Sequence, residues 1–199
     1  MSITKQAIVE ASITILNREG IDNLSMRTIA KALDVKAAAL YNHVSGKQEL
    51  LGAVAEHMCT VCTLPEPMDD PLEYLMSMCH AYRVMLLTVR DSTLVFENSH
   101  PNTPQRAGII RLMSDTILQL GVKWENLMTA SNMMNNYVLS FVADEIRFRK
   151  QSPEATQEFA EMLGMDKRPI FISERGFDEQ FDYGLCVLFA GMKAEQSIK

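Results

Sequence analysis

The sequence predicts an all-α protein, in which an N-terminal three-helix domain of the helix-turn-helix type precedes a larger C-terminal helical domain. Apolar residues recur at helical spacing along most of the chain, and glycine, proline and helix-capping residues separate these segments. A hydrophobic fraction of 47% in 199 residues is ample for two cores. We therefore expect one domain over residues 1–62 and a second over residues 63–199.

The first domain contains clear signals for where its helices begin and end. Gly20 is placed to end the first helix, and Ser25 to cap the second. Asp34 and Val35 interrupt the apolar pattern and predict a tight turn before a third, short helix. A fourth helix connects this domain to the next and is interrupted by the segment LPEPMDDP. The expected helices are 5–19, 26–33, 36–43 and 47–62.

Capping residues also mark the start of the second domain. Asp70, Pro71 and Glu73 fit the N-cap, N1 and N3 positions of a long helix. Ser152 and Pro153 are placed to open a small extra helix in the same way. The other expected helices are 71–89, 93–98, 103–121, 124–149 and 178–193, and a loop is expected over 164–176.

The segment 24–50 carries side chains that suit DNA recognition. Arg27 and Lys36 can donate to guanine, Asn42 can pair with adenine, and alanine methyl groups can pack against thymine methyl groups. Tyr41 and Lys47 are placed to contact phosphates. An ordinary helical hairpin with a solvated basic face would show the same pattern, so it remains the alternative from pattern alone. The predicted DNA-binding residues are Ser25, Met26, Arg27, Lys36, Ala37, Ala38, Ala39, Tyr41, Asn42, His43 and Lys47.

The distribution of charge restricts DNA contact to the N-terminal part. Between residues 25 and 47 there are four basic residues and one acidic residue, whereas the whole chain has a net charge of −6. A net acidic chain is a poor general binder of polyanions, so DNA binding must depend on a small, salt-sensitive footprint. The chain shows no secretory leader and no apolar run of about 18 residues, so we expect a cytoplasmic protein without a membrane partner.

Three motifs in the first 60 or so residues give a more specific indication. These motifs are LNREGIDNLS, TIAKALDV and LYNHVSGKQELL, which follow one another in a fixed order. Their order fixes the spacing of Gly20, Ser25, Tyr41, His43 and Lys47. In this the chain closely resembles the N-terminal domain of the tetracycline-repressor (TetR) family. The resemblance implies a transcription regulator, most simply a repressor, that binds double-stranded operator DNA. Three consecutive alanines stand where family members often have polar base readers, so DNA shape is expected to contribute to recognition.

The second domain is similar to that of the tetracycline repressor after which the family is named. Tyr82-Arg83, Arg90-Asp91, Pro101, Gly121 and the closing FDYGLCVLFAGM fall in the order seen there. The resemblance implies a homodimer in which helices 124–149 and 178–193 pair across a twofold axis. Two DNA readers about one helical turn apart also require a dimer. Small residues that would allow close helix approach there are Gly184, Ala190 and Gly191.

The same comparison argues against tetracycline as the small-molecule effector. Phe96 falls where the relative has its magnesium-binding histidine, and Met113 falls where it has a ligand-binding glutamine. The many methionines suggest instead a pocket for a small apolar or aromatic effector, although core packing is the more common role of each one. The expected ligand-binding residues are Met78, Tyr82, Phe96, His100, Met113, Met133, Met134 and Tyr137.

Other functions have weaker support in the sequence. Cys59 and Cys62 form a CxxC pair with His57 close by, so a thiol- or metal-sensing regulator is conceivable, but the second ligand pair of a zinc site is missing. No phosphate loop, metal-binding helix motif or nucleophile elbow indicates an enzyme, and the sequence indicates no catalytic residue, metal or cofactor. A helical ligand-binding or interaction protein without DNA binding is the remaining alternative.

Overall fold

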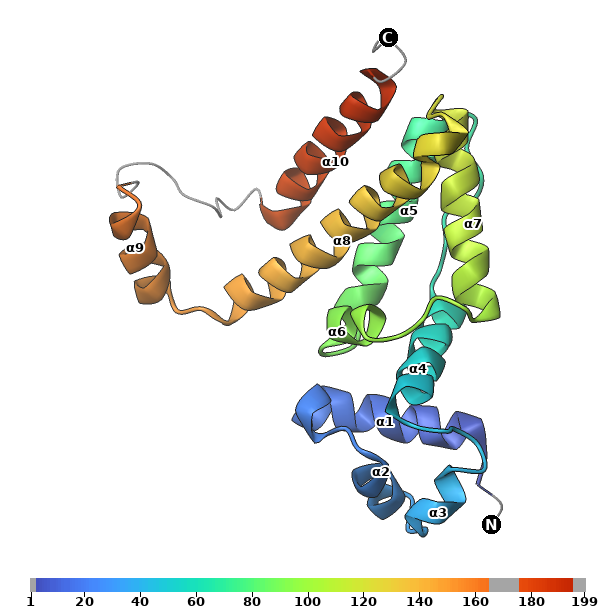
Figure 1. Cartoon of the computed structure of the whole chain (residues 1–199). Coiled ribbons are helices and arrows are strands. Elements are labelled where there is room, and N and C mark those ends of the chain that lie inside the picture. Colours follow the sequence, from blue (N-terminus) through green and yellow to red (C-terminus); the bar gives the residue numbers. More distant parts are fainter. Residues whose placement is uncertain (1–2, 165–175, 195–199) are drawn as a thin grey trace. The chain divides into compact units, whose positions relative to one another are not determined.

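The computed structural model describes residues 3–164 and 176–194, which are largely helical and contain no strand (Figure 1). The all-α prediction is therefore confirmed. The expected loop over 164–176 lies outside the described residues except for its two end glycines. The elements are α1 (Lys5–Glu19), η1 (Ile21–Asn23), α2 (Met26–Ala32), α3 (Ala37–Leu40), α4 (Lys47–Val61), α5 (Pro71–Leu87), α6 (Ser92–Glu97), α7 (Pro104–Gln119), η2 (Trp124–Asn126), α8 (Leu127–Lys150), α9 (Pro153–Met162) and α10 (Gly176–Ala194).

The predicted caps determine where several of these helices begin and end. Gly20 ends α1 with φ of 85°, a left-handed conformation that glycine adopts without strain. The Asp70 carboxylate accepts a hydrogen bond of 2.8 Å from the backbone N–H of Leu72 at the start of α5. Ser152 accepts one of 3.2 Å from Ala155 at the start of α9. These side chains satisfy backbone donors that the helices themselves leave free.

A compact turn joins α2 to α3. The Val35 N–H donates to the Ala30 carbonyl at 3.0 Å, the Asp34 N–H donates to the Lys31 carbonyl at 3.3 Å, and Asp34 has φ of 52°. This is a Schellman motif, with aspartate at the position that usually holds glycine. The helix after the turn is shorter than the predicted 36–43. After Leu40 the His43 N–H bonds back three residues, so the chain tightens into a turn and buries Val44.

The described chain forms two compact units. The first contains residues 3–67 and 77–115, so α6 and most of α5 and α7 are packed with the N-terminal helices. Within it α1 packs against α2 and α4, and α4 packs against α6. Its core is aliphatic and completely buried at Ile8, Leu16, Ile29, Leu40 and Leu50. The short helices α2 and α3 are thus held by their neighbours rather than by their own propensity.

The second unit contains residues 68–76, 116–164 and 176–194, and α10 packs against α8 in it. The Tyr137 hydroxyl donates to the Phe181 carbonyl at 2.9 Å, and the two rings stack at 5.6 Å between centroids. A Cβ atom on Gly184 would lie 2.1 Å from the Tyr137 hydroxyl oxygen. Gly184 therefore allows α10 to approach α8 of the same chain, whereas the sequence analysis expected it to serve approach between chains.

Candidate functional site

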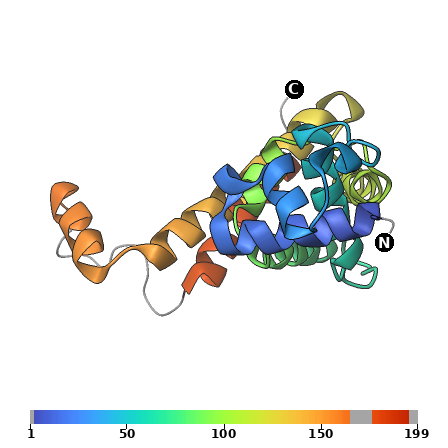
Figure 2. The ribbon, with the colours of Figure 1, turned by 90° about the horizontal axis from the view of Figure 1, so that it is seen from below.

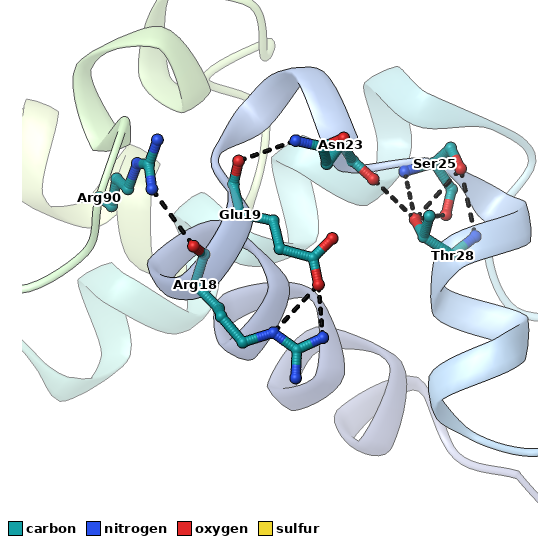
Figure 3. Close-up of polar contacts among 6 residues, drawn as sticks. All are labelled: Arg18, Glu19, Asn23, Ser25, Thr28 and Arg90. Atoms are coloured by element: carbon teal, nitrogen blue, oxygen red, sulfur yellow. Dashed lines mark hydrogen bonds and ion pairs between the residues drawn. The ribbon is translucent and has the colours of Figure 1, made fainter.

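Polar contacts lock the corner between α1 and α2, which positions the segment that is predicted to read DNA. Ser25 accepts from the Thr28 N–H at 3.2 Å, and the Ser25 N–H donates to the Thr28 hydroxyl oxygen at 2.9 Å, so each residue caps the other (Figure 3). The Thr28 hydroxyl also donates to the Asn23 carbonyl at 2.8 Å, and the Asn23 amide donates to the Glu19 carbonyl at 2.9 Å. These bonds fix the direction in which α2 leaves α1.

The predicted base-reading residues are exposed: Arg27 lies on α2, Lys36 is the N-cap of α3, and Asn42 lies in the turn after α3. The side chains of Arg27 and Lys36 have no hydrogen-bond or ion-pair partner within the ranges that the structure describes, so both are available to an incoming ligand. Seen from below, α1 to α3 lie in front of the rest of the first unit (Figure 2). Leu40 is buried, as expected. Of the other predicted residues, Ser25, Ala38, Tyr41, Asn42 and Lys47 are exposed, and Met26, Ala37, Ala39 and His43 are half-buried.

The start of α4 is organised around Glu49. Its carboxylate accepts from both the backbone N–H and the hydroxyl of Ser45 at 2.8 Å, and it pairs with Lys5 of α1 at 3.2 Å. The hydrogen bonds from Ser45, with that from Lys5, lower the pKa of Glu49 to about 2. The Lys47 ammonium donates to the Ile21 carbonyl at 3.4 Å. This arrangement places Lys47, at the positive end of the α4 dipole, next to η1.

The turn between α5 and α6 holds the other end of α1. The Arg90 backbone N–H donates to the Asn17 side chain at 2.9 Å. The Arg90 guanidinium donates to the Arg18 carbonyl at 3.3 Å, as Figure 3 shows. The Asp91 carboxylate accepts from the Ile21 N–H at 2.8 Å. Gly20 passes so close that a Cβ atom there would lie 2.9 Å from the Arg90 guanidinium. The end of α1 is therefore fixed by residues from beyond the predicted 1–62 domain.

Two predicted ligand residues come together with an arginine that the sequence analysis did not identify. The rings of Tyr82 and Phe96 lie 5.7 Å apart, and the Arg106 guanidinium lies 4.6 Å from the centre of the Phe96 ring. Arg106 also donates to the Phe96 carbonyl at 3.0 Å and to the Ser99 hydroxyl at 2.7 Å. Burial raises the pKa of Tyr82 and lowers that of Arg106. We call Tyr82, Phe96 and Arg106 the aromatic–arginine cluster.

A carboxylate from α4 caps the helix that carries Arg106. Glu56 accepts from the Gln105 N–H at 2.9 Å and from the Arg106 N–H at 3.1 Å, at the start of α7. Burial alone would raise the pKa of Glu56, but the hydrogen bonds from the Gln105 and Arg106 N–H groups help to lower it overall. Glu56 therefore remains ionised at neutral pH and joins α4 directly to α7.

The other predicted ligand residues lie in separate places. Met78 and Met113 are buried in the first unit, whereas His100 is exposed and shares a hydrogen bond of 3.0 Å with Gln48 of α4. This contact lies in a groove of about 990 Å³ lined by residues of α1, α4 and the 100–104 loop. In the second unit Met134 is buried, Met133 is 52% exposed, and Tyr137 joins α8 to α10.

Three of the four cysteines, Cys59, Cys62 and Cys79, lack the properties of a sensor. Cys59 and Cys79 are buried, and desolvation raises the pKa of each thiol to about 12. Burial also raises the pKa of Cys62. The three thiols therefore stay protonated at neutral pH, while nucleophilic attack and metal binding need the thiolate. In the described part of the chain no three histidine, cysteine or acidic residues are grouped to hold a metal ion.

An exposed helix-turn-helix of this kind, anchored to a larger helical region, defines a DNA-binding transcription regulator. Residues 8–54 match the family described as bacterial regulatory proteins of the tetR family, and residues 64–196 match the tetracycline repressor-like C-terminal domain. The chain belongs to the TetR family of transcriptional regulators. Members of this family are dimeric, non-enzymatic DNA-binding proteins. No helix in the described ranges is long and apolar enough to cross a bilayer.

Three relatives illustrate this similarity. The class C tetracycline repressor protein of Escherichia coli is 26% identical over 96% of this chain and 91% of its own length. The structure of ActR of Streptomyces coelicolor in complex with (S)-DNPA is 25% identical, with a TM-score of 0.79, and covers 98% of this chain and 99% of its own. The structure of BioQ of Mycobacterium smegmatis is 28% identical, with a TM-score of 0.76, and the match covers 96% of this chain and 98% of the BioQ chain.

Proposed function

We propose that the chain is a dimeric repressor that leaves a palindromic operator when a small apolar or aromatic effector binds. Residues 1–62 would read the DNA, and residues 63–199 would bind the effector and pair the two chains. The observation that carries this proposal is the double attachment of the reader, through the Arg90-Asp91 turn and through the Glu56 cap. A structure of BioQ with its double-stranded DNA operator supports the operator-binding part of the proposal. The complex of ActR with (S)-DNPA supports the effector-binding part.

On the DNA side, we assign base reading to Arg27, Lys36 and Asn42, and methyl contacts to the alanines 37–39. Tyr41, His43 and Lys47 would hold phosphates, with Ser25 and Met26 at the start of α2 close to the backbone. The exposure of Arg27, Lys36, Tyr41 and Asn42 supports this assignment. Operator DNA is the expected partner in the cytoplasm, where we place the protein.

On the effector side, we assign the binding site to the aromatic–arginine cluster and the buried methionines near it in sequence. An effector that displaced α6 or α7 would move α4 through the Glu56 cap and so change the separation of the two readers. A differential affinity of about 3 kcal/mol between the two states would weaken operator binding roughly 150-fold, which is a usual allosteric magnitude.

Selection of bound sequences from a random DNA pool tests the proposal directly. The purified chain should enrich palindromes whose half-sites lie about one helical turn apart. On the selected operator, Lys47→Ala should weaken binding to all sequences and lower the salt dependence, whereas Arg27→Ala should relax the preference at one position. Lys123→Ala, which removes an exposed charge outside the reader, is the control. Enrichment of no sequence, or equal losses in all three variants, would exclude the proposed reader.

A further inference from the structure

The Arg106 guanidinium has no carboxylate as a hydrogen-bond or ion-pair partner in the part of the chain that the structure describes. The guanidinium is half-buried, and its acceptors are the Phe96 carbonyl, the Ser99 carbonyl and the Ser99 hydroxyl, all of them neutral. Within the described ranges it has no ion pair, and its Nε–H has no acceptor. Cations that are partly withdrawn from solvent are usually paired, so a half-buried guanidinium with only neutral acceptors is an unusual feature of the first unit.

The titratable side chains that act on the Arg106 guanidinium are also neutral at physiological pH, and the ionised Glu56 contacts the backbone N–H of Arg106 instead. Tyr82 and Cys59 are the titratable groups whose charge states influence the guanidinium, and burial raises the pKa of both. The phenol and the thiol therefore keep their protons. Arg106 lies beside the Tyr82–Phe96 pair, whose rings form an apolar surface next to the cation. A cation next to aromatic rings suits a ligand with both an anionic and an aromatic part.

We propose that the effector is an aromatic carboxylate whose anionic group binds the Arg106 guanidinium and whose ring packs beside Tyr82 and Phe96. That such a ligand is the effector rests on the proposed function, whereas the anion site itself rests on these contacts alone. A carboxylate at Arg106 would compete with the carbonyls of Phe96 and Ser99 for the guanidinium. It would thereby loosen the end of α6 from α7, whose first N–H groups are bound by Glu56 of α4.

The test compares aromatic acids with neutral molecules of the same shape. Benzoic, naphthoic and anthroic acids and their primary amides are titrated into the full-length protein without DNA, by calorimetry at neutral pH. At least one acid should bind at least tenfold more tightly than its amide, because hydrogen bonds to a charged partner are the stronger ones. Arg106→Gln should weaken binding of that acid roughly tenfold to a hundredfold and leave the amide unchanged.

Two further variants keep the result interpretable. Arg111→Gln removes an exposed cation from the same helix and should leave binding of the acid unchanged. Arg106→Lys retains the charge without the planar fork and should give an intermediate loss in a folded protein. The proposal is overturned if no acid binds, if the amides bind equally well, or if Arg106→Gln has no effect. An acid that binds through Arg106 but does not release the selected operator supports the site and refutes its role as the effector site.

Discussion

At the scale of single residues, the side chains that matter most are those with partners far away in the chain. Glu56 reaches Gln105 across 49 positions, and Asp91 reaches Ile21 across 70. No periodicity or local motif reveals such pairs, so sequence reasoning did not predict the contacts of Glu56 and Asp91 or the place of Arg106, and the DNA-reading residues that it named stay predictions. The capping role of Thr28 could have been predicted from the sequence, because Ser25 and Thr28 have the spacing of a capping box.

Glu49 gives a pH-dependent prediction at this scale. Its folded pKa of about 2 lies below the model-compound value of 4.5, so its contribution to stability is fully present above about pH 4.5 and is lost as the pH falls towards 2. Wild type should therefore be more stable than Glu49→Gln at pH 6, and the difference should shrink between pH 4.5 and 2. Urea unfolding of both proteins across this range measures it, and a constant difference would contradict the assignment of the ionised form.

At the scale of elements, most helix positions could be predicted because caps and glycines mark them in the sequence. The exception was α3, where strong helix formers suggested a longer helix than the four residues observed. Burial of Leu40 and Val44 outweighs the propensity of the intervening residues. For Gly184, the pattern of small residues indicated close helix approach but not which helix approaches. The structure shows that α8 of the same chain approaches it.

The packing of α10 on α8 predicts a marked cost for Gly184→Ala. The added methyl group would meet a Tyr137 ring that is held by carbonyls of Gln180 and Phe181, so we expect a loss of about 1–3 kcal/mol in unfolding free energy. Gly108→Ala in α7, where nothing lies within 4 Å of the new Cβ, should instead stabilise by roughly 0.5–1 kcal/mol. Thermal and urea unfolding compare the two, and equal effects would refute the close contact.

At the scale of the whole molecule, the second unit leaves apolar side chains exposed on α8 and α10. Tyr183 is 73% exposed and Val187 56%, on the same helix as the exposed Ala190 and Gly191. Large exposed apolar patches usually mark interaction sites. A dimer of this family pairing through these two helices would cover them, which agrees with the twofold arrangement expected from the sequence.

Val187→Glu tests this dimer surface. Two like charges brought together at a twofold interface should raise the dimer dissociation constant roughly a hundredfold, and operator affinity should fall with it. Val84→Glu on α5 adds the same charge at a residue that is 61% exposed outside α8 and α10, and it should leave the dimer intact. Sedimentation velocity separates the outcomes. A Val187→Glu protein that remains as dimeric as the Val84→Glu protein would place the interface elsewhere.

The Glu56 cap has a consequence for gene expression in the absence of any effector. If α4 swings away from α7 spontaneously, the Gln105 and Arg106 N–H groups lose their acceptor, and this loss opposes the change. A minor state disfavoured by a few kcal/mol is populated at about 0.1–10%, so the cap helps to set how often an unliganded dimer releases its operator. Background transcription would then depend in part on the Glu56 carboxylate.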